Sequence, residues 1–273
     1  MPSTFTTKEL SKRTWLEYVR FFSQGNGWDH CGCTFAQGFR APKELRTWAD
    51  QRDWNLDVKR RLVEDRRAHG ILVYAGREPV GWCQFGPANE LPRAPGSTSR
   101  ARVEFGPRTR LFAQGEDRLW RITCFCTHPD HSMQGVTGVA LRAALRSIAK
   151  KGGGVVEAYP IVLAKGDPET DERLARVIEW YSTFSRLLKT HGRFSEEMEE
   201  HLRNRVQVTE FVEGIGEVDA TYHGRGANVG TVNLFRREGF EAVSVVPPKR
   251  RSYVHPDRHP TLIVMRKTVR PAR

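Results

Sequence analysis

One stretch, residues 118–159, constrains the fold more than any other part of the chain. Its first ten residues are rich in β-branched and aromatic side chains, which predicts a strand over 118–127. A polar turn follows, and an apolar helical pattern over 136–151 runs into three consecutive glycines that end the helix. A second strand is predicted over 155–159, where Pro160 stops it. The stretch therefore predicts a unit of strand, glycine turn, helix and strand.

The rest of the chain adds helices and a hairpin ahead of this unit. Apolar residues at three- and four-residue spacing predict a helix that Ser11 caps, and a second helical region over 42–67. Residues 70–86 contain two apolar runs around a Gly/Pro turn, which predicts a β-hairpin. Residues 92–110 are rich in Pro, Gly, Ser and Arg and predict a loop, while 261–265 predict the last strand.

The length and composition predict one globular core with an insertion. Single domains usually have roughly 100–200 residues, and this chain has 273. Its 38% hydrophobic and 10% aromatic residues are enough to bury a sizeable core. No apolar run approaches the roughly 18–20 residues that span a bilayer, and the first residues lack the apolar stretch of a signal peptide. We therefore expect a cytoplasmic protein with no membrane partner.

The net charge of +12 has two interpretations. It indicates either a surface for polyanions such as nucleic acid, or a solvated basic exterior with a local site for an anionic cofactor. The chain has no zinc-finger spacing, no RNA-recognition signature and no basic helix with heptads. Nucleic acid is therefore not the expected partner.

The glycine turn between the first strand and the helix carries a chemical signal. Gly135 and Gly138 lie at the predicted first turn of the helix, where backbone N–H groups lack partners within the helix. Free amides and the positive end of the helix dipole favour an anion, and small residues let a phosphate approach the backbone. An ordinary tight turn between a strand and a helix is the alternative explanation.

Several stretches together resemble one known superfamily. They are Trp-Arg-Ile-Thr-Cys-Phe at 120–125, Val-Val-Glu-Ala-Tyr-Pro at 155–160, the hairpin at 78–87, the late segment 228–240, and Cys31-Gly-Cys33. In this pattern the chain resembles the GNAT (Gcn5-related N-acetyltransferase) superfamily, and a subgroup of it with these strands and an N-terminal Cys-x-Cys. The resemblance implies an α/β (α+β) fold: a central mixed, mostly antiparallel sheet flanked by helices. It also implies acetyl transfer from acetyl-CoA to an amine.

The resemblance implies roles for particular residues. The backbone of the first strand of the unit would pair with pantetheine, and the glycine turn would hold the pyrophosphate. The implied cofactor residues are Phe125, Cys126, Thr127, Gln134, Gly135, Val136, Thr137, Gly138 and Asn228.

Some positions depart from the superfamily pattern. Ser132 replaces the usual Arg or Gln, and Thr137 replaces the usual Gly or Ala of the phosphate motif. Phe235 stands where many members have a tyrosine that protonates the leaving thiolate, and Arg121 stands where one branch has a glutamate base. The site is therefore expected to differ from the common pattern in its phosphate turn and in its proton transfers.

The expected catalytic residues are Glu157 and Tyr159. Alternation along the second strand of the unit places both side chains on one face, and a carboxylate among apolar residues would have a raised pKa, as a general base needs. Tyr159 or Tyr222 would replace the missing acid. The alternatives are that Glu157 pairs with an arginine such as Arg121 to hold strands together, and that the tyrosines only pack.

The cysteines give no recognised metal pattern. His30, Cys31 and Cys33 lack a second ligand pair at zinc-like spacing, so we expect buried reduced thiols and no metal. Cys124 and Cys126 have no evident partner for nucleophilic catalysis and are expected to pack.

Residues 163–220 interrupt the superfamily pattern and predict a helical insertion after the fifth strand, between core parts 1–162 and 221–273. Its helices either pack on the core or form a lid over the acceptor, and an apolar stripe from Leu174 to Leu188 could instead support a homodimer. The predicted function is acetyl-CoA-dependent N-acetyltransfer to a primary amine of a small molecule or protein. The alternative is a non-catalytic module that senses CoA or uses its basic surface.

Overall fold

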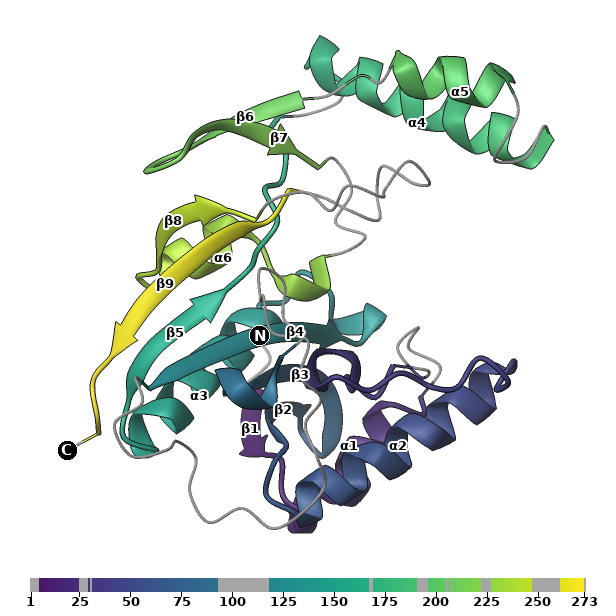
Figure 1. Ribbon diagram of the computed structural model, residues 1–273. Coiled ribbons are helices and arrows are strands. Elements are labelled where there is room, and N and C mark those ends of the chain that lie inside the picture. The colour runs from purple at the N-terminus through teal and green to yellow at the C-terminus, as the bar shows by residue number, and fades with distance from the viewer. Residues whose placement is uncertain are drawn as a thin grey trace.

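A computed structural model describes residues 5–24, 29, 31–92, 118–166, 169–190, 196–204, 206, 208–221, 227–246 and 261–272. Within these ranges, seven strands form one sheet in the order β1-β2-β3-β4-β5-β9-β8 (Figure 1). The strands are β1 (Phe5–Glu9), β2 (His69–Ala75), β3 (Glu78–Pro87), β4 (Leu119–Thr127), β5 (Gly154–Ala158), β8 (Glu241–Val245) and β9 (Ile263–Val269).

Neighbouring strands of this sheet are antiparallel except for β4 and β5, which are parallel. The helix α3 (Val136–Lys150) connects these two strands, since parallel neighbours need a crossover connection. The sheet is therefore mixed and mostly antiparallel, as the sequence predicted.

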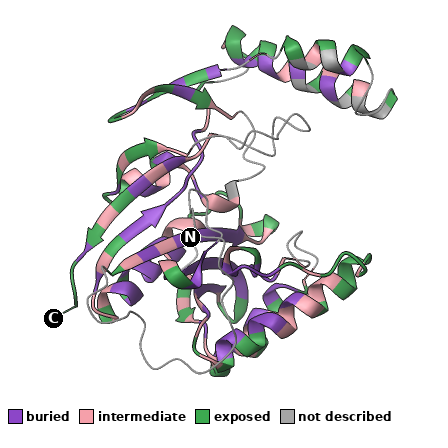
Figure 2. Ribbon diagram, in the orientation of Figure 1, coloured by how far each residue is buried: buried purple, intermediate pink, exposed green. Residues whose placement is uncertain are grey.

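Helices cover both faces of the sheet. Along one face, α3 packs against β1 to β4 and β9, and the core there contains alternate strand residues such as Val73, Trp120 and Met265. On the other face, α1 (Trp15–Phe21) and α2 (Trp48–Glu64) pack against the β1–β4 half. Figure 2 shows buried residues concentrated along the strands between these helices. The described helices include none with the length and apolar character needed to cross a bilayer.

The insertion after β5 contains two helices and one element that the sequence analysis missed. The helices are α4 (Glu172–Thr190) and α5 (Glu196–Arg203). A separate two-stranded hairpin, β6 (Val208–Val212) and β7 (Gly216–Ala220), follows them. Val212 and Val218 of the hairpin join the main core, whereas α4 and α5 lie beyond it, away from the seven-stranded sheet (Figure 1). The insertion is thus helical in its first part and β in its second.

The apolar stripe of α4 is covered within the chain. Leu174 and Val177 pack with Val208 of the hairpin, and Trp180 and Phe184 pack with Met198 of α5. These four stripe residues are therefore buried within the chain, and a homodimer stays an untested prediction. The expected cap at residues 167–168 lies outside the described residues.

The other differences from the sequence analysis are the start of α2 and one further strand. α2 begins at Trp48 instead of residue 42, because Thr47 caps it by accepting a hydrogen bond from the Asp50 N–H at 3.0 Å. The strand β1 was not predicted; it pairs with β2 at the edge of the sheet. Before β8 the chain forms a 3-10 turn, η5 (Ala227–Val229), and the short helix α6 (Val232–Arg237). Further 3-10 turns are η1 (Lys12–Thr14), η2 (Phe35–Gln37), η3 (Ala88–Glu90) and η4 (Pro129–His131).

Candidate functional site

The strands β4 and β5 separate before β4 ends. They pair only from Leu119↔Val155 to Ile122↔Ala158, whereas β4 continues to Thr127. The separation starts at a β-bulge: Gln84 of β3 pairs with Cys124 and Phe85 pairs with Ile122, so Thr123 is the extra residue. Bulges bend a strand and often lie beside functional sites. Beyond the bulge, β4 has β3 on one side and no paired strand on its β5 side within the described chain.

The residues after β5 border this opening on its far side. The Ile161 N–H donates to the Gly230 carbonyl at 3.1 Å, and the Ile161 carbonyl accepts from the Val232 N–H at 3.0 Å. These bonds place η5 against β4, with Gly230 close to the Phe125 ring. The structure therefore brings Phe125 and the half-buried Asn228, which the sequence analysis assigned to one site, to the same part of the molecule.

The glycine turn lies at the end of β4 and is open to solvent. Gly135, the N-cap of α3, has a φ of 83°, and a Cβ placed there would meet nothing within 4 Å. The first hydrogen bond of the helix runs from the Val139 N–H to the Gly135 carbonyl at 3.1 Å. The amides of Val136, Thr137 and Gly138 precede that bond and lie at the positive end of the helix dipole. The glycine turn thus has the open geometry that the sequence analysis expected, and its binding of an anion stays a prediction.

Side chains connect the turn to its surroundings. The Gln134 side-chain amide donates to the Asp130 carbonyl at 2.9 Å, which holds the turn closed. The hydroxyls of Thr127 and Thr137 lie 3.5 Å apart, so the end of β4 and the first turn of α3 are in contact. The threonine that replaces the usual small residue of the phosphate motif is therefore used for this contact.

Arg142 is a cation near the turn that the sequence analysis missed. Its guanidinium lies 3.5 Å from where a Cβ of Gly138 would be, and it pairs with Glu238 at 2.9 Å. The signal was available in the sequence, since Arg142 follows Gly138 by four residues and so lies one helical turn away on the same face. An arginine there adds a mobile positive charge to the fixed amides.

Glu157 lies in a row of charged side chains across three strands. Its cross-strand neighbours are Arg121 on β4 and Arg266 on β9. Arg266 donates to Glu157 Oε1 through Nε at 2.9 Å and through Nη2 at 2.7 Å, and Arg121 Nε lies 3.6 Å from Oε2. The Tyr159 hydroxyl donates to Oε2 at 2.8 Å and accepts from Arg121 Nε at 3.1 Å. The two expected catalytic residues are thus in contact with each other.

The expected raised pKa of Glu157 is wrong. Burial raises the pKa of this carboxyl, but the hydrogen bonds from Arg266 and Tyr159 and the charges of both arginines outweigh burial and bring it below its ordinary value. The sequence analysis placed the carboxylate among apolar residues, whereas cross-strand pairing places it between two guanidinium groups. Burial also raises the pKa of Tyr159 well above its usual range. These contacts fit the strand-holding alternative, and the catalytic roles of Glu157 and Tyr159 stay untested predictions.

Two further aromatic positions concern the expected proton transfer to the thiolate, Phe235 and Tyr222. Phe235 is 0% exposed and packs edge-on against Phe125, with ring centroids 6.0 Å apart. It belongs to the core and does not stand in for a catalytic tyrosine. Tyr222 lies outside the described residues.

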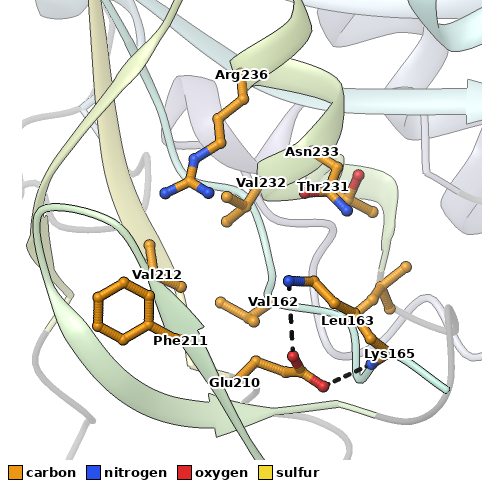
Figure 3. Close-up of a pocket in the computed structure, with 10 residues that line it drawn as sticks. All are labelled: Val162, Leu163, Lys165, Glu210, Phe211, Val212, Thr231, Val232, Asn233 and Arg236. Carbon is orange, nitrogen blue, oxygen red and sulfur yellow. Dashed lines mark hydrogen bonds and ion pairs between the residues drawn. The ribbon is translucent and has the colours of Figure 1, made fainter.

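A small pocket lies between the β6–β7 hairpin and α6 (Figure 3). Glu210 accepts a hydrogen bond from the Lys165 N–H at 2.7 Å in its wall, and Phe211 and Arg236 lie at its rim. Its volume of ≈ 20 Å³ suits about one water molecule. This hollow is too small for a cofactor or an acceptor.

Comparisons with known proteins find similarity only among solved structures. No protein-family model matches the chain, and no curated protein matches it. An Escherichia coli ribosomal-protein-S18-alanine N-acetyltransferase is 9% identical to this chain, with a TM-score of 0.38. The alignment covers 99% of this chain and 97% of the E. coli chain. A GCN5-related N-acetyltransferase from Kribbella flavida is 11% identical at a TM-score of 0.43 over 98% and 99%. An aminoglycoside 6'-N-acetyltransferase complexed with coenzyme A is 10% identical at 0.43, again over 98% and 99%.

Proposed function

We propose that the protein is an acetyl-CoA-dependent N-acetyltransferase of the GNAT type, which transfers acetyl directly from the thioester to a primary amine. One observation carries the proposal: in the described chain the β5 side of β4 is unpaired beyond Thr123, and the turn after β4 ends in the open N-terminus of α3. An extended ligand with an anionic end fits such an arrangement. We include in the proposal the subgroup with the Cys-x-Cys segment, and a cytoplasmic location.

The backbone of β4 would bind the extended part of the cofactor. Phe125, Cys126 and Thr127 lie beyond the bulge, where the β5 side of the strand is unpaired in the described chain. A pantetheine amide chain there would add hydrogen bonds in the manner of a further strand. The side chains of Phe125 and Cys126 point into opposite cores, so only their backbone groups would take part.

The turn from Gln134 to Gly138 would bind the pyrophosphate. Amides at the start of α3 offer donors and positive potential, and Arg142 adds a charge that can leave Glu238 for a phosphate. Asn228 in η5 lies on the other side of the opening and could donate to the cofactor. Bound in this way, acetyl-CoA would supply an activated acyl group for transfer to the amine.

The reaction needs positioning and two proton transfers. The neutral amine attacks the thioester carbonyl, the C–N bond forms, and the C–S bond breaks with departure of the thiolate. The amine proton leaves and the thiolate gains a proton. Backbone N–H groups of β4 beyond the bulge can stabilise the oxyanion that forms in between. Glu157 as base and Tyr159 as acid remain part of the prediction, although the two arginines make this carboxylate a weak base.

The test is thiol release from acetyl-CoA in the presence of an amine panel that contains both small amines and peptides with free N-termini. Release that depends on the amine supports an enzyme. Thermal protection by CoA without any release would favour the alternative, a CoA-sensing module, which the buried Phe235 and the arginine-bound Glu157 make worth testing. If acetyl-CoA releases no thiol and CoA gives no thermal protection, both the enzyme and the CoA-sensing module are contradicted.

Replacing Arg142 by Gln should weaken CoA binding about ten- to a hundredfold, since a hydrogen bond to a charged group contributes about 1.5–3 kcal/mol. The matched control is Arg146→Gln, which removes the same charge from the exposed side of α3 one turn further from the glycine turn. Isothermal titration with CoA measures both. Equal loss in the two variants would indicate a general charge effect and argue against a phosphate contact by Arg142.

The insertion helices should affect the acceptor and leave the cofactor site intact. We expect that replacing residues 167–206 by a Gly/Ser linker of about eight residues preserves thermal protection by CoA and lowers or redirects amine turnover. The hairpin β6–β7 is kept, because Val212 and Val218 belong to the main core. A folded deletion variant with an unchanged acceptor profile would contradict a role in acceptor selection. Loss of CoA protection would contradict the placement of the cofactor site.

A further inference from the structure

Three cysteine thiols from distant parts of the chain meet on the α1–α2 face of the sheet. The Sγ atoms of Cys33, Cys124 and Cys126 all lie within 4.8 Å of one another. Cys33 and Cys124 are 3.3 Å apart, and Cys124 and Cys126 are 3.7 Å apart. All three residues are buried, and Cys31 lies 4.0 Å from Cys33. The fifth cysteine, Cys83, is buried in the core of the opposite face.

The local backbone directs these thiols to one point. Cys124 and Cys126 alternate along β4 and so share a face, directly after the bulge. Cys33 reaches them from a loop in which both Gly32 and Cys33 have left-handed backbone angles, with φ of 49° and 46°. A non-glycine residue with such a φ is uncommon and strained, and it persists only where the surroundings fix it.

Two buried side chains fix the Cys33 backbone. The Lys59 ammonium donates to the Cys33 carbonyl at 3.0 Å, and the Gln84 side-chain amide donates to the same oxygen at 2.7 Å. Gln84 in turn accepts from the Thr123 hydroxyl at 3.0 Å, which connects this support to the bulge. The thiol cluster is therefore held from α2, β3 and β4 at once.

Among the described residues, no carboxylate forms an ion pair with Lys59. Lys59 is 1% exposed, and its hydrogen bonds in the described chain go to two neutral oxygens, the Cys33 carbonyl and Gln37 Oε1. A buried ammonium is costly unless negative charge lies nearby. The nearest groups able to carry that charge are the clustered thiols, which as thiolates would need a cation between them.

We propose that Cys33, Cys124 and Cys126, with Cys31 as the fourth ligand, bind a structural Zn²⁺ ion. A tetrahedral site with Zn–S bonds of about 2.3 Å has sulfur–sulfur edges of about 3.8 Å, and the observed separations of 3.3, 3.7 and 4.0 Å bracket that edge. Four thiolates around Zn²⁺ have a net charge of −2, and Lys59 offsets half of it. The Cys31 thiol lies 4.0 Å from Cys33 but not within 4.8 Å of all three other thiols, so its side chain would have to turn to complete the coordination.

The zinc ion would tie the loop at 31–33 to β4, the strand with the unpaired side. This assignment does not depend on the acetyltransferase proposal, because the thiols point to the face opposite α3. A disulfide between Cys33 and Cys124 is the competing outcome. The metal is favoured because the buried thiols are shielded from oxidants, and because a disulfide would leave the neighbouring Cys126 without a partner in the cluster.

The test uses the full chain without a histidine tag, produced with zinc and purified with a phosphine reductant and no chelator. Metal analysis should find one zinc per chain in the wild type and in Cys83→Ser, which removes a buried thiol outside the cluster. Cys124→Ser and Cys126→Ser should lose it, and Cys31→Ser should bind it more weakly. Removing the metal from the wild type by chelation should lower its Tm.

Cobalt keeps the test valid where a serine variant fails to fold. Wild-type protein depleted of metal and titrated with Co²⁺ should show thiolate-to-cobalt charge transfer and the visible bands of a tetrahedral site, saturating at one ion per chain. A wild type that holds no zinc and gives no such spectrum would overturn the proposal. So would equal zinc loss in Cys83→Ser, or an intact mass two hydrogens lighter with Cys33 linked to Cys124.

Discussion

Replacing Gly135 by Glu is expected to abolish thermal protection by CoA. A ligand that binds only the folded state at a hundred times its Kd adds about 2.7 kcal/mol of stability, which raises the Tm by several degrees. The Gly135 position faces open space at the start of α3, so a carboxylate there would occupy the anion site and repel a phosphate. Thermal unfolding with and without CoA measures the loss.

The matched control for this variant is Gly76→Glu. Gly76, in the turn between β2 and β3, also has a positive φ, 60°, and a Cβ there would also meet nothing within 4 Å. Both variants add the same charge and the same left-handed strain, which costs about 1–2 kcal/mol. Gly76→Glu should keep full protection at its own lower Tm. Protection that survives in Gly135→Glu would place the cofactor elsewhere.

Replacing Glu157 by Gln is expected to destabilise the fold. Removal of one partner from a buried ion pair costs about 3–5 kcal/mol, and we expect about 2 kcal/mol here because the Arg266 side chain is 53% exposed. Urea unfolding measures this as a lower midpoint at constant slope. The control is Glu78→Gln, which breaks an exposed pair with Arg20 and should change stability by less than about 1 kcal/mol.

The pH dependence gives the same test a second measurement. The pKa of Glu157 is lower in the folded protein than its unfolded value of about 4.3. The stability that this carboxylate contributes is therefore present above that unfolded value and is lost as the pH falls through the lower, folded pKa. The wild type should lose stability in this acid range, and Glu157→Gln should lose less.

The rate of the same variant separates the two roles of Glu157. A general base would show a fall in kcat of about 10²–10⁴-fold with little change in stability or CoA affinity. If Glu157 only holds the strands together, the variant would be less stable, and its kcat would return to the wild-type value at a lower temperature, where the variant is fully folded. Full stability together with a normal rate would contradict both roles.

The sequence by itself was enough to locate the elements around the proposed cofactor site. The strand at 118–127, the helix at 136–151 and the strand at 155–159 correspond to β4, α3 and β5 within one residue at each end. Their signals are local: β-branched runs, helical periodicity and glycine stops each act over a few residues. The sequence also placed Gly135 at the start of this helix, whereas its left-handed φ of 83° is known only from the structure. The strand β1 and the β6–β7 hairpin were missed, because each of their strands mixes polar with apolar residues over five positions, whereas the equally short β5 has two adjacent valines and ends shortly before a proline.

The surroundings of the individual side chains were decided only by the tertiary structure. Arg266 lies 109 residues after Glu157, and only the pairing of β5 with β9 makes it the neighbour that lowers the carboxyl pKa. Cys33 and Cys124 are 91 residues apart, so the spacing of either Cys-x-Cys pair gave no sign that the two pairs meet. A pKa or a ligand set depends on contacts within a few ångströms. Sheet register fixes those contacts, and it is a property of the whole fold.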